Sequence, residues 1–166
     1  MSNSVQHIVV LGAGESGVGA AILAKEKGFH VLVSDGGNIK EKYKVELDRH
    51  AIYWEEGGHS NKIHSADLVI KSPGIPNSSP LIQGFKTKGT SVIGEIEFAA
   101  RYTQAKMICI TGSNGKTTTT HLAHHVLKKG GLNVEMAGNM GESLARKVLT
   151  HPADYYVLEL SSFQLE

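Results

Sequence analysis

The sequence predicts an α/β fold with parallel sheets, and three observations support this prediction. Short apolar runs alternate with helix-like segments along almost the whole 166-residue chain, which is typical of β-α-β units. Two different glycine-rich motifs each stand between an apolar run and a helix-like segment. The composition, with 40% hydrophobic and 20% charged residues, is that of a globular protein that can bury a sizeable core.

Five apolar runs are the clearest strand candidates. They are rich in Val, Ile and Leu and alternate little with polar residues, so we expect them to be buried on both faces of a sheet. These runs cover residues 7–11, 30–34, 67–71, 107–111 and 154–160. Shorter strands are predicted at residues 51–54, 91–93 and 133–136.

The helix candidates lie between these strands. They cover residues 16–27, 80–88, 95–102, 116–129 and 142–149. Three of them are followed closely by a glycine, at Gly28, Gly89 and Gly130. Glycine is common just past the last helical residue because it adopts the left-handed conformation that ends a helix. We therefore expect these three glycines to end their helices.

The charge balance and the single cysteine exclude several classes of function. Seventeen Lys and Arg residues against sixteen Asp and Glu leave a formal net charge of +1, without the excess of cations that nucleic acid or an anionic membrane requires. Cys109, which we expect in the core, rules out an internal disulfide and a cysteine-rich zinc site. No run approaches the ~18 apolar residues of a membrane span, and the first residues do not resemble a secretory leader. We expect a cytoplasmic protein, and the sequence leaves its oligomeric state open.

A domain boundary is expected near residues 102–106, just before the strand that leads into the second glycine motif. It divides the chain into residues 1–105 and residues 106–166. A piece of about 60 residues holds only about three strands and two helices, fewer than a complete nucleotide-hydrolysing domain needs. We therefore expect the chain to be the front part of a longer protein.

The first glycine motif is Gly12-Ala13-Gly14-Glu15-Ser16-Gly17, and Asp35 follows at the end of the second predicted strand. This G-x-G-x-x-G pattern is the Rossmann fingerprint: its glycines allow a tight turn, close approach of a phosphate and close packing of helix on strand. N–H groups at the helix start favour a diphosphate, and Asp35 can accept hydrogen bonds from a ribose or a base. The pattern does not choose between NAD, its commonest ligand, and another nucleotide. Glycines that serve packing alone are the alternative.

The second glycine motif is Thr111-Gly112-Ser113-Asn114-Gly115-Lys116-Thr117-Thr118, after an apolar strand and at the start of a helix. It departs from the strict P-loop spacing because Ile110 stands where the first glycine belongs. Its functional end is intact. Gly115 allows close backbone approach, Lys116 supplies a cation for terminal phosphates, and Thr117 supplies a hydroxyl ligand for Mg²⁺.

A carboxylate inside an apolar strand is the expected partner of this second motif. Glu159 stands within residues 154–160, where an isolated buried carboxylate is costly unless a cation or a proton compensates it. We therefore predict that Glu159 binds Mg²⁺ together with Thr117. The alternative is a glutamate that faces solvent at the end of the strand.

Two further loops follow predicted strands, at the edge where open α/β sheets bind ligands. The run Lys71-Ser72-Pro73-Gly74-Ile75-Pro76 has a backbone constrained by two prolines and a glycine, and Asn139 in the other loop offers a side-chain amide. We expect the first loop to cover the ligand of the first glycine motif, and Asn139 to contact a ligand. Ordinary turns are the alternative in both cases.

In combination, these motifs resemble the Mur ligase family of bacterial peptidoglycan synthesis. The resemblance covers essentially the whole chain and rests on five segments: residues 12–17, 72–75, 111–118 and 138–141, and the highly specific run Leu158-Glu159-Leu160-Ser161-Ser162-Phe163-Gln164-Leu165-Glu166. The first glycine motif and the Ser-Pro-Gly-Ile loop favour the family members that add D-glutamate to UDP-N-acetylmuramoyl-L-alanine.

The resemblance implies a UDP-sugar site in the first unit, in place of a NAD site, and an ATP site in the second. The UDP-sugar site would consist of Gly14, Glu15, Ser16, Asp35, Gly36, Gly74, Asn139, Ser161 and Gln164. The ATP site would consist of Gly112, Ser113, Asn114, Gly115, Lys116, Thr117 and Thr118. Lys116, Thr117 and Glu159 would act in catalysis, and the last two would share a Mg²⁺ ion. The uracil would lie near Asp35 and Gly36, where backbone contacts are expected because relatives often have larger side chains after the aspartate.

The implied reaction activates a carboxylate. ATP would phosphorylate the alanine carboxylate, and the amino group of D-glutamate would attack the resulting acyl phosphate. Mg²⁺ and Lys116 would offset the repulsion between the carboxylate and the triphosphate. The family's remaining ATPase elements and its D-glutamate-binding domain have no counterpart in these 166 residues, so we expect the chain alone to be inactive. A non-catalytic module that binds NAD or UDP is the alternative function.

Overall fold

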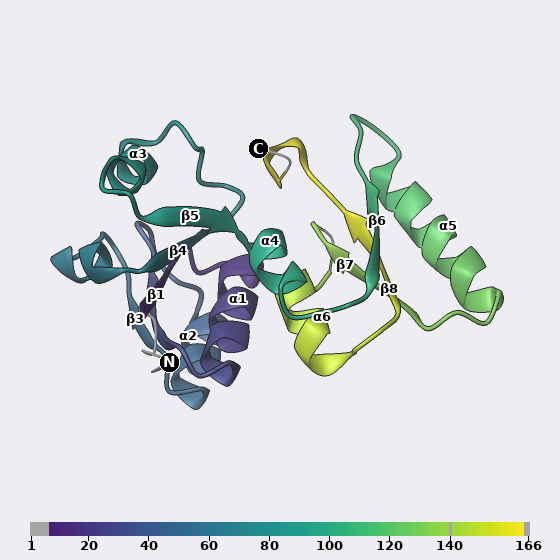
Figure 1. Ribbon diagram of the computed structural model, residues 1–166, viewed down its shortest axis with the longest axis horizontal. Helices are drawn as coiled ribbons and strands as arrows, with labels where there is room; N and C mark the ends of the chain where they lie inside the picture. The colour runs from purple at the N-terminus through teal and green to yellow at the C-terminus, as the bar shows by residue number, and fades with distance from the viewer. Residues whose placement is uncertain (1–6, 140, 165–166) are drawn as a thin grey trace.

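A computed structural model describes residues 7–139 and 141–164 of the chain. Two parallel sheets lie next to each other, and helices pack against both of them (Figure 1). The first sheet has the strand order β3-β2-β1-β4-β5, and the second has the order β6-β8-β7. This arrangement confirms the predicted α/β fold with parallel sheets. Within the described residues, no helix is both long enough and apolar enough to cross a membrane.

The first sheet is centred on β1. Its strands are β1 (His7–Leu11), β2 (His30–Ser34), β3 (Tyr53–Glu55), β4 (Leu68–Lys71) and β5 (Ser91–Gly94). Successive side chains of β1 belong to two different buried clusters, with Ile8 and Val10 in one and Val9 and Leu11 in the other. Both faces of β1 are therefore covered, as its apolar sequence predicts.

Four helices accompany this sheet. They are α1 (Glu15–Glu26), α2 (Glu41–Arg49), α3 (Pro80–Thr87) and α4 (Glu95–Ala100), with a short 3-10 helix η1 (Asn61–Ser65) before β4. Helix α3 begins as its sequence indicates, because Ser79 Oγ accepts the N–H of Ile82 and Pro80 occupies the first turn. Ile82 and Phe85 of α3 cover the face of β1 that carries Val9 and Leu11.

The second sheet is centred on β8. Its strands are β6 (Lys106–Ile110), β7 (Val134–Gly138) and β8 (Tyr155–Glu159), and its helices are α5 (Lys116–Lys129), α6 (Leu144–Thr150) and the 3-10 helix η2 (Ser162–Gln164). Residues 156–159 of β8 are buried because β6 and β7 pair on either side. The motif residues Met140, Leu165 and Glu166 lie outside the described part of the chain.

The first unit consists of β1 to β5 with α1 to α4, and the second consists of β6 to β8 with α5 and α6. Helix α1 joins these two units. Its residues 17–24 are buried because it packs on the first sheet and also against α4 and α6 (Figure 1). Leu144 of α6 and Tyr156 and Leu158 of β8 belong to the same hydrophobic cluster as Ile8 and Val10 of β1. The two sheets therefore share one continuous core.

Two expectations for the fold are wrong. Helix α2 is not among the predicted helices because it is mostly polar, with only Tyr43 and Leu47 buried. Strand β6 is not buried on both faces, and Cys109 is exposed rather than in the core, because β6 lies at the edge of its sheet. Helix α5 ends at Lys129 with Gly130 as its C-cap, as predicted, and the left-handed residue is the next one, Gly131, with a φ of +86°.

Candidate functional site

The first glycine motif forms the turn from β1 into α1, and two of its glycines leave no room for a side chain. Gly12 has a φ of +89°, and a Cβ there would lie 2.7 Å from Ser72 Oγ. A Cβ on Gly17 would lie 1.9 Å from the carbonyl oxygen of Gly12. Gly14 differs, because its Cβ position has nothing within 4 Å and no side chain caps the first turn of α1. The N–H groups of that turn therefore border open space, as an anion site requires.

Asp35 binds the backbone of this turn and also the backbone of its own loop after β2. Its Oδ2 accepts the N–H of Ala13 at 2.6 Å, and its Oδ1 accepts the N–H of Gly37 at 2.8 Å. Gly36, between Asp35 and Gly37, is exposed. The aspartate thus braces the turn, in addition to any contact with a ligand.

The loop after β4 packs directly on the first glycine turn. Ser72 Oγ donates to the carbonyl oxygen of Gly12 at 3.2 Å, and the N–H of Ile75 donates to the carbonyl oxygen of Ser72 at 3.0 Å. Gly74 is exposed within this loop, with nothing within 4 Å of its Cβ position. Gly14 and Gly74 therefore lie at the same carboxyl edge of the first sheet, on two loops that contact each other.

The second glycine motif connects β6 to α5. Gly115 precedes the helix in the left-handed conformation, with a φ of +76°, and α5 has no side-chain cap. Lys116 Nζ donates to the carbonyl oxygen of Gly112 at 2.7 Å, so the ammonium folds over its own loop. Residues 112–115 and Thr118 are exposed, whereas Thr117 is half-buried. This loop combines helix N–H groups with one cation, which suits phosphate oxygens.

Glu159 ends the central strand of the second sheet and is only 3% exposed. The register places it between Ile110 of β6, just before the second glycine motif, and Gly138 of β7. Its Oε1 lies 3.4 Å from Nδ2 of Asn139, while Oε2 is buried without a hydrogen-bond partner. A buried carboxylate oxygen without a partner is costly, and a cation would relieve that cost.

The donor set at Glu159 fits Mg²⁺, which prefers oxygen ligands and keeps several waters. Among the described residues, no three His, Cys, Asp or Glu side chains surround a possible metal position. Glu159 and the Thr117 hydroxyl would therefore complete a Mg²⁺ shell with oxygens from phosphate and water. This orphaned carboxylate oxygen is the structural feature that favours a metal here over a solvent-facing glutamate.

A cavity of about 320 Å³ lies beside the ends of β4 and β5, and the segment after β8 forms its remaining wall. Lys71 and Pro73 line it from the end of β4 and the loop that follows, Glu95 lines it from α4, and Phe163 and Gln164 line it from the segment after β8. Figure 1 shows this last segment, in yellow, directed back toward the first sheet. Both units thus contribute walls to one cavity.

Gln164 and Ser161 contact each other at this cavity. Gln164 Oε1 accepts the N–H of Ser161 at 2.8 Å and the hydroxyl of Ser161 at 3.1 Å. The two predicted site residues after β8 therefore form one unit, in which the glutamine orients the serine.

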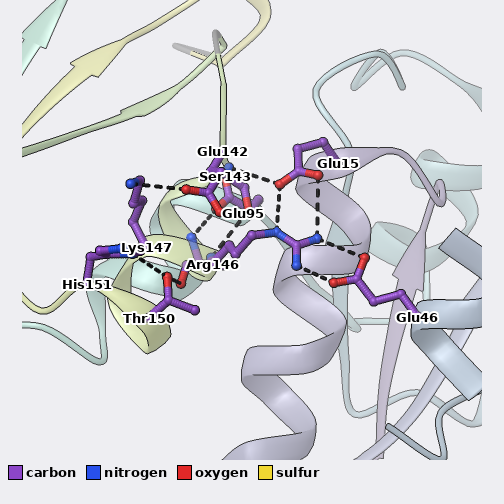
Figure 2. Close-up of polar contacts among 10 residues, drawn as sticks. Glu15, Glu46, Glu95, Glu142, Ser143, Arg146, Lys147, Thr150 and His151 are labelled. Carbon is purple, nitrogen blue, oxygen red and sulfur yellow. Dashed lines mark hydrogen bonds and ion pairs between the residues drawn. The ribbon is translucent and has the colours of Figure 1, made fainter. Parts of the chain in front are cut away.

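Glu15 directs its carboxylate toward Arg146 of helix α6 (Figure 2). Its Oε1 accepts hydrogen bonds from Nε of Arg146 at 2.9 Å and from the N–H of Ser143 at 3.3 Å. Arg146 also binds both carboxylate oxygens of Glu46. A contact of Glu15 with a diphosphate would therefore use its backbone N–H.

Electrostatics keep Arg146 charged at this interface. Burial lowers the pKa of the guanidinium, but the hydrogen bonds and charges of Glu46 and Glu15 outweigh burial and raise it above its usual value. The planar guanidinium can form paired hydrogen bonds with each of the two carboxylates, and its charge strengthens these bonds. The ion-pair network thus ties α1 and α2 of the first unit to α6 of the second.

Glu95 is the second buried carboxylate near the cavity, at 3% exposure. Its Oε1 accepts the N–H of Ala145 at 2.6 Å, and its Oε2 has no hydrogen-bond partner. Burial raises its pKa to about 7; the N–H of Ala145 opposes the rise, and the charge of Glu15 adds to it. Glu95 is therefore partly protonated near neutral pH, at the contact between α4 and α6.

The sequence motifs do not identify the residues that join the two units. Nothing local marks Arg146 as the partner of Glu15, because the two residues are 131 positions apart. One readable signal is Gly19 in the middle of a predicted helix, since a central glycine indicates close approach of another backbone or side chain. A Cβ on Gly19 would lie 2.1 Å from Ser143 Oγ, which caps α6 by accepting the N–H of Arg146.

Comparison with known proteins identifies related domains and chains. Residues 7–81 match the MurD N-terminal domain, and residues 110–166 match the Mur ligase middle domain. A UDP-N-acetylmuramoylalanine--D-glutamate ligase of Bacteroides fragilis is 64% identical over 163 residues, which are 98% of this chain and 37% of that protein. Proteins of the same name are 61% identical in Porphyromonas gingivalis, over 96% of this chain and 36% of the relative, and 40% identical in Chlorobaculum parvum, over 96% and 35%. The chain thus spans little more than a third of the length of these curated relatives.

Solved structures share the arrangement of the elements. A UDP-N-acetylmuramate:L-alanyl-gamma-D-glutamyl-meso-diaminopimelate ligase from Neisseria meningitides superposes with a TM-score of 0.62 at 20% identity, over 94% of this chain and 52% of that chain. The UDP-N-acetylmuramate-alanine ligase MurC from Thermotoga maritima gives a TM-score of 0.57 at 23% identity, over 94% and 37%. At these identities the likeness shows the fold.

Proposed function

This chain belongs to the Mur ligase family, and we propose that it forms the nucleotide-sugar-binding domain and part of the ATP-binding domain of a ligase that adds D-glutamate to UDP-N-acetylmuramoyl-L-alanine. The observation that carries the proposal is the cavity of about 320 Å³ beside β4 and β5 of the first sheet, to which Phe163 and Gln164 of the second unit contribute one wall. A phosphoryl transfer between two bound substrates requires such a shared space, because the acceptor must approach the triphosphate in line.

The first unit is proposed to bind the UDP part of the sugar nucleotide. The open N–H groups at the start of α1, with Gly14 beside them, suit a diphosphate, and exposed Gly74 lies on the loop that contacts this turn. Asp35 and Gly36 follow the neighbouring strand β2, where the nucleoside would lie. Asn139, Ser161 and Gln164 follow β7 and β8 and would meet the remainder of the substrate.

The second unit is proposed to bind ATP and Mg²⁺. Lys116 and the N–H groups around Gly115 would hold the terminal phosphates, as the exposed loop and its cation suggest. Glu159 and Thr117 would hold the metal, which would neutralise phosphate charge and orient the triphosphate. The buried, unpartnered Oε2 of Glu159 supports this assignment.

The proposed chemistry follows from the weakness of a carboxylate as an electrophile. The alanine carboxylate would attack the terminal phosphorus of ATP and displace ADP, and the amine of D-glutamate would then displace phosphate from the acyl phosphate. Lys116 would offset the negative charge that the two substrates bring together. The groups that bind D-glutamate are proposed to lie in the part of the relatives that this chain does not span. We assign the activity to the cytoplasm, where both nucleotides are available.

Thermal unfolding of the chain with ligands tests the proposal. UDP-N-acetylmuramoyl-L-alanine at about 100 times its Kd adds about 2.7 kcal/mol to stability, which raises the Tm by roughly 5–10 °C for a domain of this size. NAD(H) at the same concentration is expected to leave the Tm unchanged. Stabilisation by NAD(H) alone would favour the second candidate, a non-catalytic nucleotide-binding module, whose supporting observation is the intact G-x-G-x-x-G turn.

A further inference from the structure

Three polar side chains beside the first glycine motif form a cluster that the proposed function does not use. Ser34, the last residue of β2, is fully buried, and its Oγ donates a hydrogen bond to Oε1 of Glu55 at 2.7 Å. The same Oγ lies 2.7 Å from Nδ1 of His59, in the loop after β3. The N–H of Ser60 also donates to Oε1 of Glu55, at 2.9 Å.

The hydrogen bonds of this cluster determine which nitrogen of His59 carries the proton. Burial raises the pKa of Glu55, but hydrogen bonds from Ser34 and Ser60, together with the electrostatic effect of His59, outweigh burial and bring the pKa below its usual value. The ionised carboxylate can only accept, so the single hydroxyl proton of Ser34 is directed at Glu55. Ser34 Oγ then offers His59 only a lone pair. An imidazole with one ring N–H would therefore donate from Nδ1 to Ser34 Oγ, which would leave Nε2 as a hydrogen-bond acceptor.

The acceptor nitrogen of His59 faces Gly36. Nε2 lies 3.4 Å, and Cε1 4.0 Å, from the position that a Cβ of Gly36 would occupy. His59 and Gly36 are both exposed, so a ligand can reach this edge of the ring. Glycine at position 36 places no side chain between the ring edge and the solvent beside the backbone.

The strand order places this edge at the nucleoside end of the proposed UDP site. The glycine turn follows β1, Asp35 follows β2, and His59 comes after β3, and these three strands are neighbours in the sheet. A nucleotide whose diphosphate lies at the glycine turn and whose ribose lies at Asp35 extends toward the end of β3. Its nucleoside therefore comes closest to Asp35, Gly36 and His59.

We infer that His59 is a ligand-binding residue of this site and that its Nε2 accepts a hydrogen bond from an O–H or N–H group of the nucleoside. The inference rests on the proposed UDP-sugar site. A uridine nucleotide has such donors on the ribose and at N3 of the base. Ser34 and Glu55 hold the ring before the ligand binds, which lowers the entropy lost on binding. Ser34 is thus a positioning residue for His59.

Calorimetric titration of the chain with UDP tests the role of His59. His59→Ala is expected to weaken UDP binding about 3- to 10-fold, the effect of one hydrogen bond. The matched control is His30→Ala, which removes an exposed histidine at the opposite end of β2 and is expected to leave the Kd unchanged. Equal UDP affinity of the wild type and His59→Ala would overturn the inference while leaving the UDP site in place. Failure of the wild type to bind UDP would overturn the UDP site and the inference with it.

Three UDP analogues identify the donor. 2′-Deoxyuridine diphosphate and 3′-deoxyuridine diphosphate each lack one ribose hydroxyl, and 3-methyluridine diphosphate lacks the base N–H. One of them is expected to bind the wild type less tightly than UDP, with that loss absent in His59→Ala, because the deleted groups are partners. Losses that persist unchanged in His59→Ala for all three analogues would contradict a direct contact.

Ser34→Ala separates positioning from a general effect on stability. This variant removes the anchor of the His59 ring and is expected to weaken UDP binding in the wild-type background but not in His59→Ala. Thermal unfolding without ligand confirms that the variant is folded. An additional loss of affinity from Ser34→Ala in the His59→Ala background would show that Ser34 does not act through His59.

Discussion

The guanidinium of Arg146 lies 2.9 Å from the carboxylate of Glu15, measured from Nε to Oε1, although the two residues are 131 positions apart. Glu15 is the first residue of α1, directly after the glycine turn proposed to bind a diphosphate, and Arg146 lies on α6, shortly after Asn139. The contact therefore connects the start of α1, beside the proposed diphosphate site of the first unit, to helix α6 of the second unit. Four predictions test this interface and the two glycine loops.

Removal of the guanidinium is expected to destabilise the protein. Arg146→Ala leaves Glu15 and Glu46 without their shared partner in a partly buried position, so we expect a loss of about 2 kcal/mol in the free energy of unfolding. Urea unfolding at pH 7 measures it. The control is Arg101→Ala, whose pair with Glu97 is 49% and 60% exposed and is expected to contribute less than about 0.5 kcal/mol. Equal losses in the two variants would mean that the inter-unit pair has no special role.

Glu95 is expected to make stability depend on pH. Its pKa is about 7 in the folded protein and 4.5 in the unfolded chain, so between these values the folded state holds a proton that the unfolded state has released. Stability from this group is therefore full below pH 4.5 and is lost as the pH rises to 7, by about 3 kcal/mol in total.

The variant Glu95→Gln tests this pH dependence, because glutamine is neutral and keeps an oxygen for the N–H of Ala145. The difference in unfolding free energy between wild type and Glu95→Gln is expected to grow from pH 5 to pH 8 in favour of the variant. Glu97→Gln, at an exposed position on the same helix, serves as the control and is expected to show no such trend. A pH-independent difference for Glu95→Gln would refute the buried titration.

The glycines of the first motif are expected to respond differently to alanine. Gly17→Ala places a Cβ against the carbonyl oxygen of Gly12, which forces α1 away from the turn and costs about 2–3 kcal/mol of stability. Gly14→Ala meets no atom within 4 Å and is expected to change stability by less than about 1 kcal/mol. Its methyl group would occupy the space proposed for the diphosphate, so UDP binding should weaken. Thermal unfolding and UDP titration of both variants distinguish the two roles.

Metal-dependent nucleotide binding is expected to require Glu159. In the presence of Mg²⁺, Glu159→Gln should weaken ATP binding about tenfold, because the metal loses its one proposed carboxylate ligand. After chelation of Mg²⁺ by EDTA, wild type and variant should bind ATP equally. Asp154→Asn, next to the opposite end of β8, is the control and should behave as wild type. An unchanged Mg²⁺ effect in Glu159→Gln would remove Glu159 from the proposed metal site.

Local patterns predicted most of the fold. The range 116–129 is the observed helix α5, and the ranges 7–11 and 30–34 are the observed strands β1 and β2, because apolar periodicity and helix-ending glycines act over a few residues. Local patterns do not predict helix α2, because a helix that buries only Tyr43 and Leu47 has little apolar periodicity. Cys109 was misplaced because an apolar sequence does not tell whether its strand is central or at an edge.

The candidate site likewise contains residues that local sequence patterns predict and residues that they do not predict. The two glycine loops and buried Glu159 follow from motif spacing and from the apolar residues around the carboxylate, since each depends on near neighbours in the chain. The direction of the Glu15 carboxylate, the proton on Glu95 and the Ser34–Glu55–His59 cluster do not follow from motifs. In each case a partner from a distant segment or the degree of burial decides the chemistry.

The sequence by itself determined the parallel α/β architecture, the two glycine loops and the residue types placed at the strand ends. Only the tertiary structure decided which of those residues meet: Glu15 with Arg146, Glu95 with Ala145, and the walls of one cavity from two units. The physical reason is that backbone conformation depends on local sterics and periodic burial, whereas side-chain partners and desolvation depend on how separate elements pack.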